Sequence, residues 1–178
     1  MRTDRLQREH EVQFKWSVFP LHPETPKAGL ELADLFGGRD LDITAMQQRV
    51  AAVADSLGLT LKPRSRTFNS RAAQELGKLA QKMGLMDAYQ KSVYHAYFVD
   101  GINIAVSEEL LKIARSAGLP EEESRQAILE KTFAGEVDQD WRRSRLLGIT
   151  GVPAFLCEDK LLVGFRPYQD LVDLITPE

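Results

Sequence analysis

The order of the predicted elements constrains the fold of this chain most strongly. Residues Val12–Phe19 alternate apolar and polar side chains, which predicts a half-buried strand. Two more strands are predicted between residues 154 and 163, after a long block in which residues 42–148 show helical patterns. Strands at opposite ends of the chain must meet across these helices to bury their apolar faces. The order therefore predicts an α/β fold interrupted by a helical insertion.

The helical block carries its own start signals. Five apolar residues lie three or four positions apart and form one stripe of the first helix: Ile43, Met46, Val50, Val53 and Leu57. Asp42 is the predicted N-cap of this helix, and Gly58 follows its end. Ser107 is expected to cap a later helix, and Pro120 is expected to occupy the first position of the next one.

Composition excludes several classes of protein. The chain has 178 residues, which suits one domain or one domain with a large insertion. A formal net charge of -3 gives no basic field for nucleic acid or an anionic membrane. There is no apolar run of spanning length, and the N-terminus lacks the apolar core of a signal peptide. The single cysteine, Cys157, rules out an internal disulfide and a cysteine zinc cage. We predict a cytoplasmic protein without cofactor or metal.

The stretch GITGVPAFLCEDKLLVGF, residues 148–165, reads as a loop, a proline, a short strand, a turn and a second strand. Pro153 lies directly before the apolar strand. Because proline has no backbone N–H, it cannot donate a hydrogen bond to a neighbouring strand. This placement fits either a plain edge hairpin or a rigid loop whose backbone is held for a partner.

Four stretches together resemble the DsbA-like thioredoxin-fold oxidoreductases, in the FrnE-like branch related to 2-hydroxychromene-2-carboxylate isomerases. FKWSVFPLHPETPKAG resembles the family's second strand and the loop after it. FNSRAAQELGKLAQKMG resembles the opening of its helical insertion, and VYHAYFVDGINIAVSEELLKIARSAGLP resembles the insertion's later helices. GITGVPAF resembles its cis-proline loop. The resemblance covers essentially the whole chain.

The resemblance implies a thioredoxin-like domain made of residues 1–41 and 148–178, with a helical insertion domain at 42–147. In the family, a Cys-x-x-Cys motif follows the first strand, where the helix N-terminus lowers the pKa of the first thiol. The given sequence has neither that strand nor that motif. We therefore expect the neighbouring strands to rejoin directly or to pair with a second chain as a homodimer.

The resemblance assigns substrate binding to Thr150, Gly151, Val152 and Pro153. A cis bond before Pro153 would expose the backbone of Val152 to a thiol-containing peptide or glutathione, which would add as a short strand. A trans proline at an edge strand is the alternative. No residue is assigned a catalytic role.

Three functions stay open. The first is a thiol–disulfide oxidoreductase of the dithiol–disulfide isomerase type, inactive as given because it lacks the redox dithiol. The second is a relative of glutathione-dependent isomerases or kappa-type transferases, and the third is a non-catalytic peptide-binding or assembly module.

The other chemically suggestive residues favour structural interpretations. Cys157 lies in an apolar strand and is predicted to be a buried structural thiol. The histidines His10, His22 and His95 are scattered and are assigned no chemistry. KPRSRTFNSR, residues 62–71, is predicted to be a solvated loop before a helix. The aromatic residues Tyr89, Tyr94, Tyr97 and Phe98 are predicted to be mostly helix-packing core.

Overall fold

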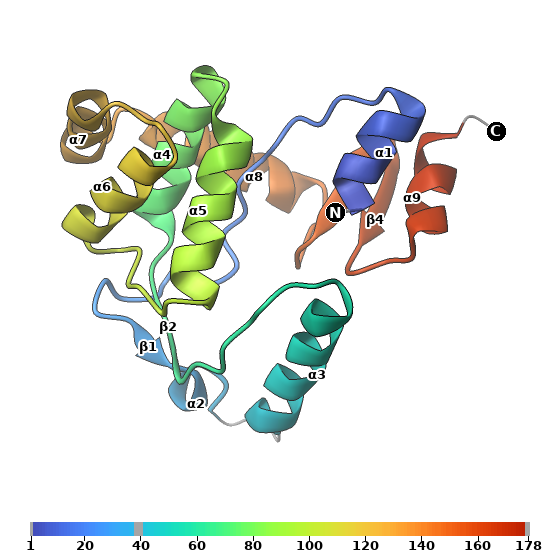
Figure 1. Cartoon of the computed structure of the whole chain (residues 1–178), viewed down its shortest axis with the longest axis horizontal. Coiled ribbons are helices and arrows are strands. Elements are labelled where there is room, and N and C mark those ends of the chain that lie inside the picture. Colours follow the sequence, from blue (N-terminus) through green and yellow to red (C-terminus); the bar gives the residue numbers. More distant parts are fainter. Residues whose placement is uncertain (1, 38–40, 177–178) are drawn as a thin grey trace. The chain divides into compact units, whose positions relative to one another are not determined.

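The computed structural model describes residues 2–37 and 41–176 (Figure 1). The elements within these residues are α1 (Arg2–His10), β1 (Leu30–Glu31), α2 (Leu32–Leu35), α3 (Ile43–Ser56), β2 (Arg66–Thr67), α4 (Arg71–Lys82), α5 (Met86–Phe98), α6 (Ser107–Ser116), α7 (Glu121–Glu130), α8 (Ala134–Leu146), β3 (Ala154–Cys157), β4 (Lys160–Val163) and α9 (Tyr168–Ile175). No helix of the described residues combines the length and apolar character that a membrane-spanning segment needs.

The chain divides into two compact units. The first unit joins Met1–Leu21 to Gln139–Glu178, and the second is His22–Asp138. The sequence places the domain boundaries after residues 41 and 147, so the observed units divide the chain at different points. The segment after Leu21 belongs with the helices because its strand β1 pairs with β2, as Leu30 opposite Thr67.

The helical unit holds the larger apolar core. Helix α4 packs against α5, α6 and α7, and the side chains of Leu76 and Leu110 are fully buried between these helices. Strand β2 interrupts the region predicted to be entirely helical. It forms because β1 supplies a ladder, which the Leu32 N–H extends by donating to the Ser65 carbonyl oxygen at 2.6 Å.

The structure confirms one of the three predicted helix starts and contradicts the other two. The Asp42 side chain accepts a hydrogen bond from the Ala45 N–H at 2.9 Å, which confirms the N-cap of α3. The predicted cap at Ser107 is wrong, because Ser107 is the first residue of α6 and its N-cap is Val106. Pro120 is the N-cap of α7, one position earlier than predicted.

The strand predicted at residues 12–19 does not form. Apolar and polar side chains do alternate between half-buried and exposed, but the segment pairs with no strand that the structure describes. It is held instead by the Val18 N–H, which donates to Asp140 Oδ2 at 2.8 Å. The expected direct rejoining with β3 is therefore also wrong, since the described part of the chain gives β3 only β4 as a partner.

The first unit is built around the β3–β4 hairpin, with α1 beside α9 (Figure 1). The hairpin is antiparallel, with Phe155 opposite Leu162. The Arg5 guanidinium lies 4.0 Å from the centre of the Tyr168 ring, and the Tyr168 hydroxyl donates to Glu9 Oε2 at 2.8 Å. These contacts fix α1 against the start of α9.

Candidate functional site

The four predicted binding residues form one surface loop between α8 and β3. Thr150, Val152 and Pro153 are exposed and Gly151 is half-buried. Val152 keeps 51% of its surface accessible. The Val152–Pro153 peptide bond is cis.

Hydrogen bonding distinguishes the two residues at the corner of this loop. The Pro153 carbonyl oxygen accepts from the Gly164 N–H at 2.8 Å, which extends the hairpin by one bond beyond β3 and β4. Within the described chain, the Val152 N–H and C=O have no hydrogen-bond partner. The edge of β3 opposite β4 also has no strand beside it among the described residues. Loop and strand together therefore present an unpaired backbone edge, which is the feature that strand addition needs.

The chemistry next to this edge is sparse. Cys157 is the last residue of β3, opposite Lys160, and its thiol is free. The residue is half-buried, so it is less enclosed than the sequence predicts. Because Cys157 is the chain's only cysteine, no second thiol of this sequence can resolve a disulfide formed on it.

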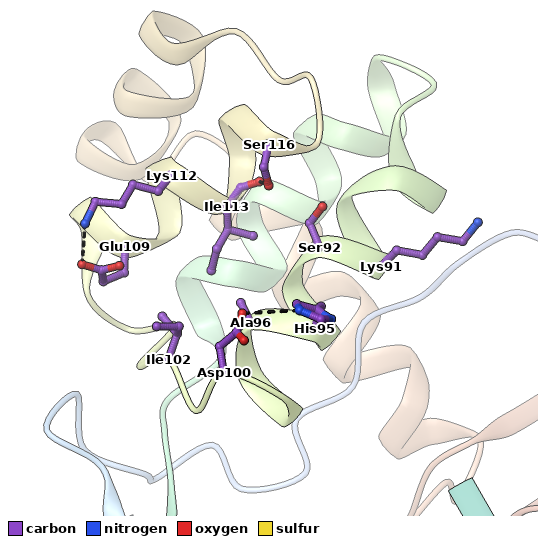
Figure 2. A pocket seen from close by; sticks show the side chains of 10 residues that line it. All are labelled: Lys91, Ser92, His95, Ala96, Asp100, Ile102, Glu109, Lys112, Ile113 and Ser116. Atoms are coloured by element: carbon purple, nitrogen blue, oxygen red, sulfur yellow. Dashed lines mark hydrogen bonds and ion pairs between the residues drawn. The ribbon is translucent and has the colours of Figure 1, made fainter. Parts of the chain in front are cut away.

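A separate pocket lies in the helical unit, between α5 and α6 (Figure 2). Its volume is about 540 Å³, and its apolar floor includes the buried residue Ile113. His95 Nε2 lies 3.6 Å from Asp100 Oδ2, and Lys112 Nζ lies 2.7 Å from Glu109 Oε1. His95 and Lys112 thus each already have a carboxylate partner inside the same chain. The structure places His95 on the rim of this pocket, with Asp100 as its ion-pair partner.

Two arginines of the stretch 62–71 have roles that the sequence interpretation missed. Arg64 is half-buried, with its guanidinium 4.6 Å from the centre of the Tyr97 ring and bonded to the Tyr97 hydroxyl. Arg71 Nε donates to Glu75 Oε1 at 2.7 Å, while its Nη1 donates to Asp138 Oδ1 at 2.6 Å. The spacing of four residues between Arg71 and Glu75 was the visible signal for a helical ion pair. Arg64 lies in the predicted loop but is half-buried, and Arg71 is the first residue of α4.

The four residues of the aromatic cluster differ in how deeply they are buried. Tyr89 is buried and Tyr97 and Phe98 are half-buried, with the Tyr97 and Phe98 rings edge to face at 4.8 Å. Tyr94, by contrast, is exposed. Most of the cluster is therefore packing, as predicted, but Tyr94 is a surface residue.

Comparison with known proteins decides the family. Residues 1–176 match the family model for the DSBA-like thioredoxin domain. The chain belongs to the DsbA-like thioredoxin family. The DsbA-like chain is also similar to the crystal structure of a probable DsbA oxidoreductase from Streptomyces coelicolor, with a TM-score of 0.78 and 27% sequence identity. That similarity covers 87% of this chain and 70% of the Streptomyces chain. No curated protein matches the sequence of this chain.

These matches confirm the resemblance stated from sequence and the thioredoxin-like fold of the DsbA-like chain, with its large helical content. They place the chain in a family of thiol oxidoreductases. The assignment to the FrnE-like branch stays a prediction.

Proposed function

We propose that the segment 150–157 is the substrate edge of a DsbA-like thiol oxidoreductase. An extended, thiol-containing peptide would lie along β3 and exchange backbone hydrogen bonds with Val152. The observation that carries this proposal is the combination of an exposed residue, unpaired Val152 backbone groups and an open strand edge at one place. Such an edge gives affinity through the main chain and therefore accepts many peptide sequences.

The 178-residue chain, on this proposal, binds its substrate without carrying out disulfide exchange. Thiol–disulfide exchange passes through a mixed disulfide that a second thiol resolves, and Cys157 has no such partner in the sequence. An insulin-reduction assay with dithiothreitol should give the same rate with and without the chain. Turnover above the dithiothreitol background would contradict this part of the proposal.

Binding is tested with a matched pair of variants. Val152→Pro removes the backbone N–H at the corner, whereas Val152→Ala shortens the side chain and keeps the backbone intact. The probe is a fluorescein-labelled extended peptide of eight residues with one central cysteine, followed by anisotropy. We expect V152A to bind the peptide as tightly as the original chain does. V152P should bind it at least about tenfold more weakly, which is the loss expected for one neutral backbone hydrogen bond. Circular dichroism checks that both variants fold.

Two further probes separate the alternatives. The same peptide with serine in place of cysteine should bind about equally if the backbone carries the affinity. Reduced glutathione is the probe for the glutathione-dependent isomerase or transferase alternative, which would be favoured if glutathione bound at Val152 and the peptide did not. If neither the peptide nor glutathione binds, residues 150–157 are not a substrate edge.

A further inference from the structure

Helix α3 has an apolar face that the fold does not use. The exposed fractions along its stripe are 36% for Met46, 55% for Val50, 40% for Val53 and 46% for Leu57, the residue that follows the helix. An amphipathic helix of a globular protein ordinarily turns such a stripe toward the core. This stripe instead lies open at four of its five residues, and the fifth, Ile43, is half-buried.

The helix is anchored through a different flank. Ala54 is buried, and the Gln47 side chain makes two hydrogen bonds to the backbone of Arg64, donating to its carbonyl oxygen at 2.8 Å and accepting from its N–H at 3.0 Å. The N-cap bond of Asp42 fixes the first turn. The helix is therefore formed and held without its stripe, so a partner that covers the stripe does not have to bear the cost of helix nucleation.

The spacing of the stripe is that of a seam between two helices. From Ile43 through Met46, Val50 and Val53 to Leu57, the steps are three, four, three and four residues. This is the alternation of the a and d positions over two heptads, which keeps one seam facing a partner helix. The charged residues of the region, Asp42, Arg49 and Asp55, all lie outside these positions.

The exposed area is enough for a small symmetric interface. Leu41 and Leu59 lie just before and just after the helix, are each 46% exposed, and add their apolar area to that of the stripe. From these fractions the combined area amounts to roughly 500 Å² per copy, at the upper end of what monomeric proteins expose. Two such faces would bury about 1,000 Å², which is the lower bound for a specific protein–protein interface.

We propose that the α3 stripe pairs with the α3 stripe of a second copy of this chain. An isologous contact places the same patch on both partners, and an uncharged seam with heptad spacing is complementary to itself. The composition argues against a lipid surface, because a membrane-surface helix is rich in lysine and arginine and carries aromatic anchors. Helix α3 has one basic residue, Arg49, and no aromatic residue.

Sedimentation velocity of the full chain tests the pairing. The chain is expected to sediment as a dimer at a protein concentration of about 50 μM, because an interface of this small size gives weak association. Val50→Lys places a charge in the seam and should give a monomer, whereas Gln48→Lys adds the same charge at an exposed position outside the stripe and should leave the dimer intact. Circular dichroism checks that both variants fold. A monomeric original chain, or a dimer that V50K does not weaken, would overturn the proposal.

Disulfide crosslinking locates the contact independently of any dimer formed through the strand edges. In a Cys157→Ser background, Val50→Cys should crosslink two copies under mild oxidation, and Gln48→Cys should not. Leu57→Cys then reports the orientation, because it crosslinks as well only when the two helices run parallel. A dimer in which V50C fails to crosslink would be held elsewhere, and the assignment to α3 would be wrong.

Discussion

Tyr89 links two helices through one buried hydroxyl, which donates to the Ala73 carbonyl oxygen at 2.8 Å. Burial raises the pKa of this phenol above its ordinary value. The unfolded chain therefore releases the proton near pH ~10 while the folded chain retains it, so stability is lost as the pH rises above that value. We predict that Tyr89→Phe lowers the free energy of unfolding by about 1 kcal/mol at neutral pH. It should also flatten the decline in stability above pH ~10.

Urea unfolding followed by circular dichroism at neutral and alkaline pH measures both effects. Tyr94→Phe is the matched control, because Tyr94 lies on the same helix α5 and is exposed. Its stability and pH profile should follow the original chain. Equal behaviour of the two variants would show that the Tyr89 hydroxyl contributes nothing.

Gly29 occupies a position that no side chain fits. Its φ is 87°, and a Cβ there would lie 2.8 Å from the Thr67 carbonyl oxygen and 2.6 Å from the Phe68 ring. Gly101 has a similar φ of 71° but open space around the missing Cβ. Gly101→Ala should cost about 1 kcal/mol, the strain of the left-handed conformation alone. Gly29→Ala should cost about 3 kcal/mol, because the β1–β2 backbone must also move. Thermal unfolding compares the two, and equal costs would mean that the close contact is relieved freely.

At the scale of elements, Arg71 ties the first turn of α4 to the first turn of α8. Besides its bonds to Glu75 and Asp138, its Nη2 donates to the Ala134 carbonyl oxygen at 2.8 Å. The Glu75 side chain is only 6% exposed, so removal of the guanidinium leaves a carboxylate in an enclosed position. We predict that Arg71→Ala lowers the free energy of unfolding by about 3 kcal/mol. Urea unfolding provides the measurement.

A double-mutant cycle tests the reason for that loss. In a Glu75→Gln background the enclosed charge is gone, and Arg71→Ala should cost at least about 1 kcal/mol less. Arg142→Ala is the control for loss of an exposed arginine, since Arg142 lies on the surface of α8. Its effect should stay within about 0.5 kcal/mol. Additive single-mutant costs would refute the coupling between Arg71 and Glu75.

Periodicity predicted individual elements well and their partners poorly. The helix of residues 43–56 and the hairpin after Pro153 lie where their local patterns place them, because capping and turn chemistry are local. The alternation of residues 12–19 also appears in their burial, but a strand needs a ladder partner that no local pattern supplies. The loop 150–153 was located by its likeness to a family. The ion pair of Arg71 with Asp138 joins residues more than sixty positions apart and left no local pattern, whereas the pair with Glu75 left the four-residue spacing of a helical ion pair.

At the scale of the whole molecule, the two units differ in what they bury. Among the described residues of the first unit, the buried apolar side chains are Leu6 and Leu171, whereas the helical unit has a cluster of fifteen residues. Local opening costs less where fewer apolar contacts are lost. We therefore predict that amides of the β3–β4 hairpin exchange with deuterium roughly a hundredfold faster than those of α4. Native-state exchange, corrected for intrinsic rates, measures this difference, and equal protection of both elements would contradict it.

The same hydrogen-exchange experiment also tests the proposed substrate edge, because that edge lies in the unit with the smaller core. A peptide that adds to β3 supplies hydrogen bonds and covers apolar surface in the less protected unit, so binding should slow exchange in the hairpin. Helix α4 should keep its rate, because its amides are already protected by the buried cluster around Leu76. With V152P, which lacks the corner N–H, the peptide should leave the hairpin unprotected. Slowing confined to α4 would place the peptide in the helical unit and away from the loop at Pro153.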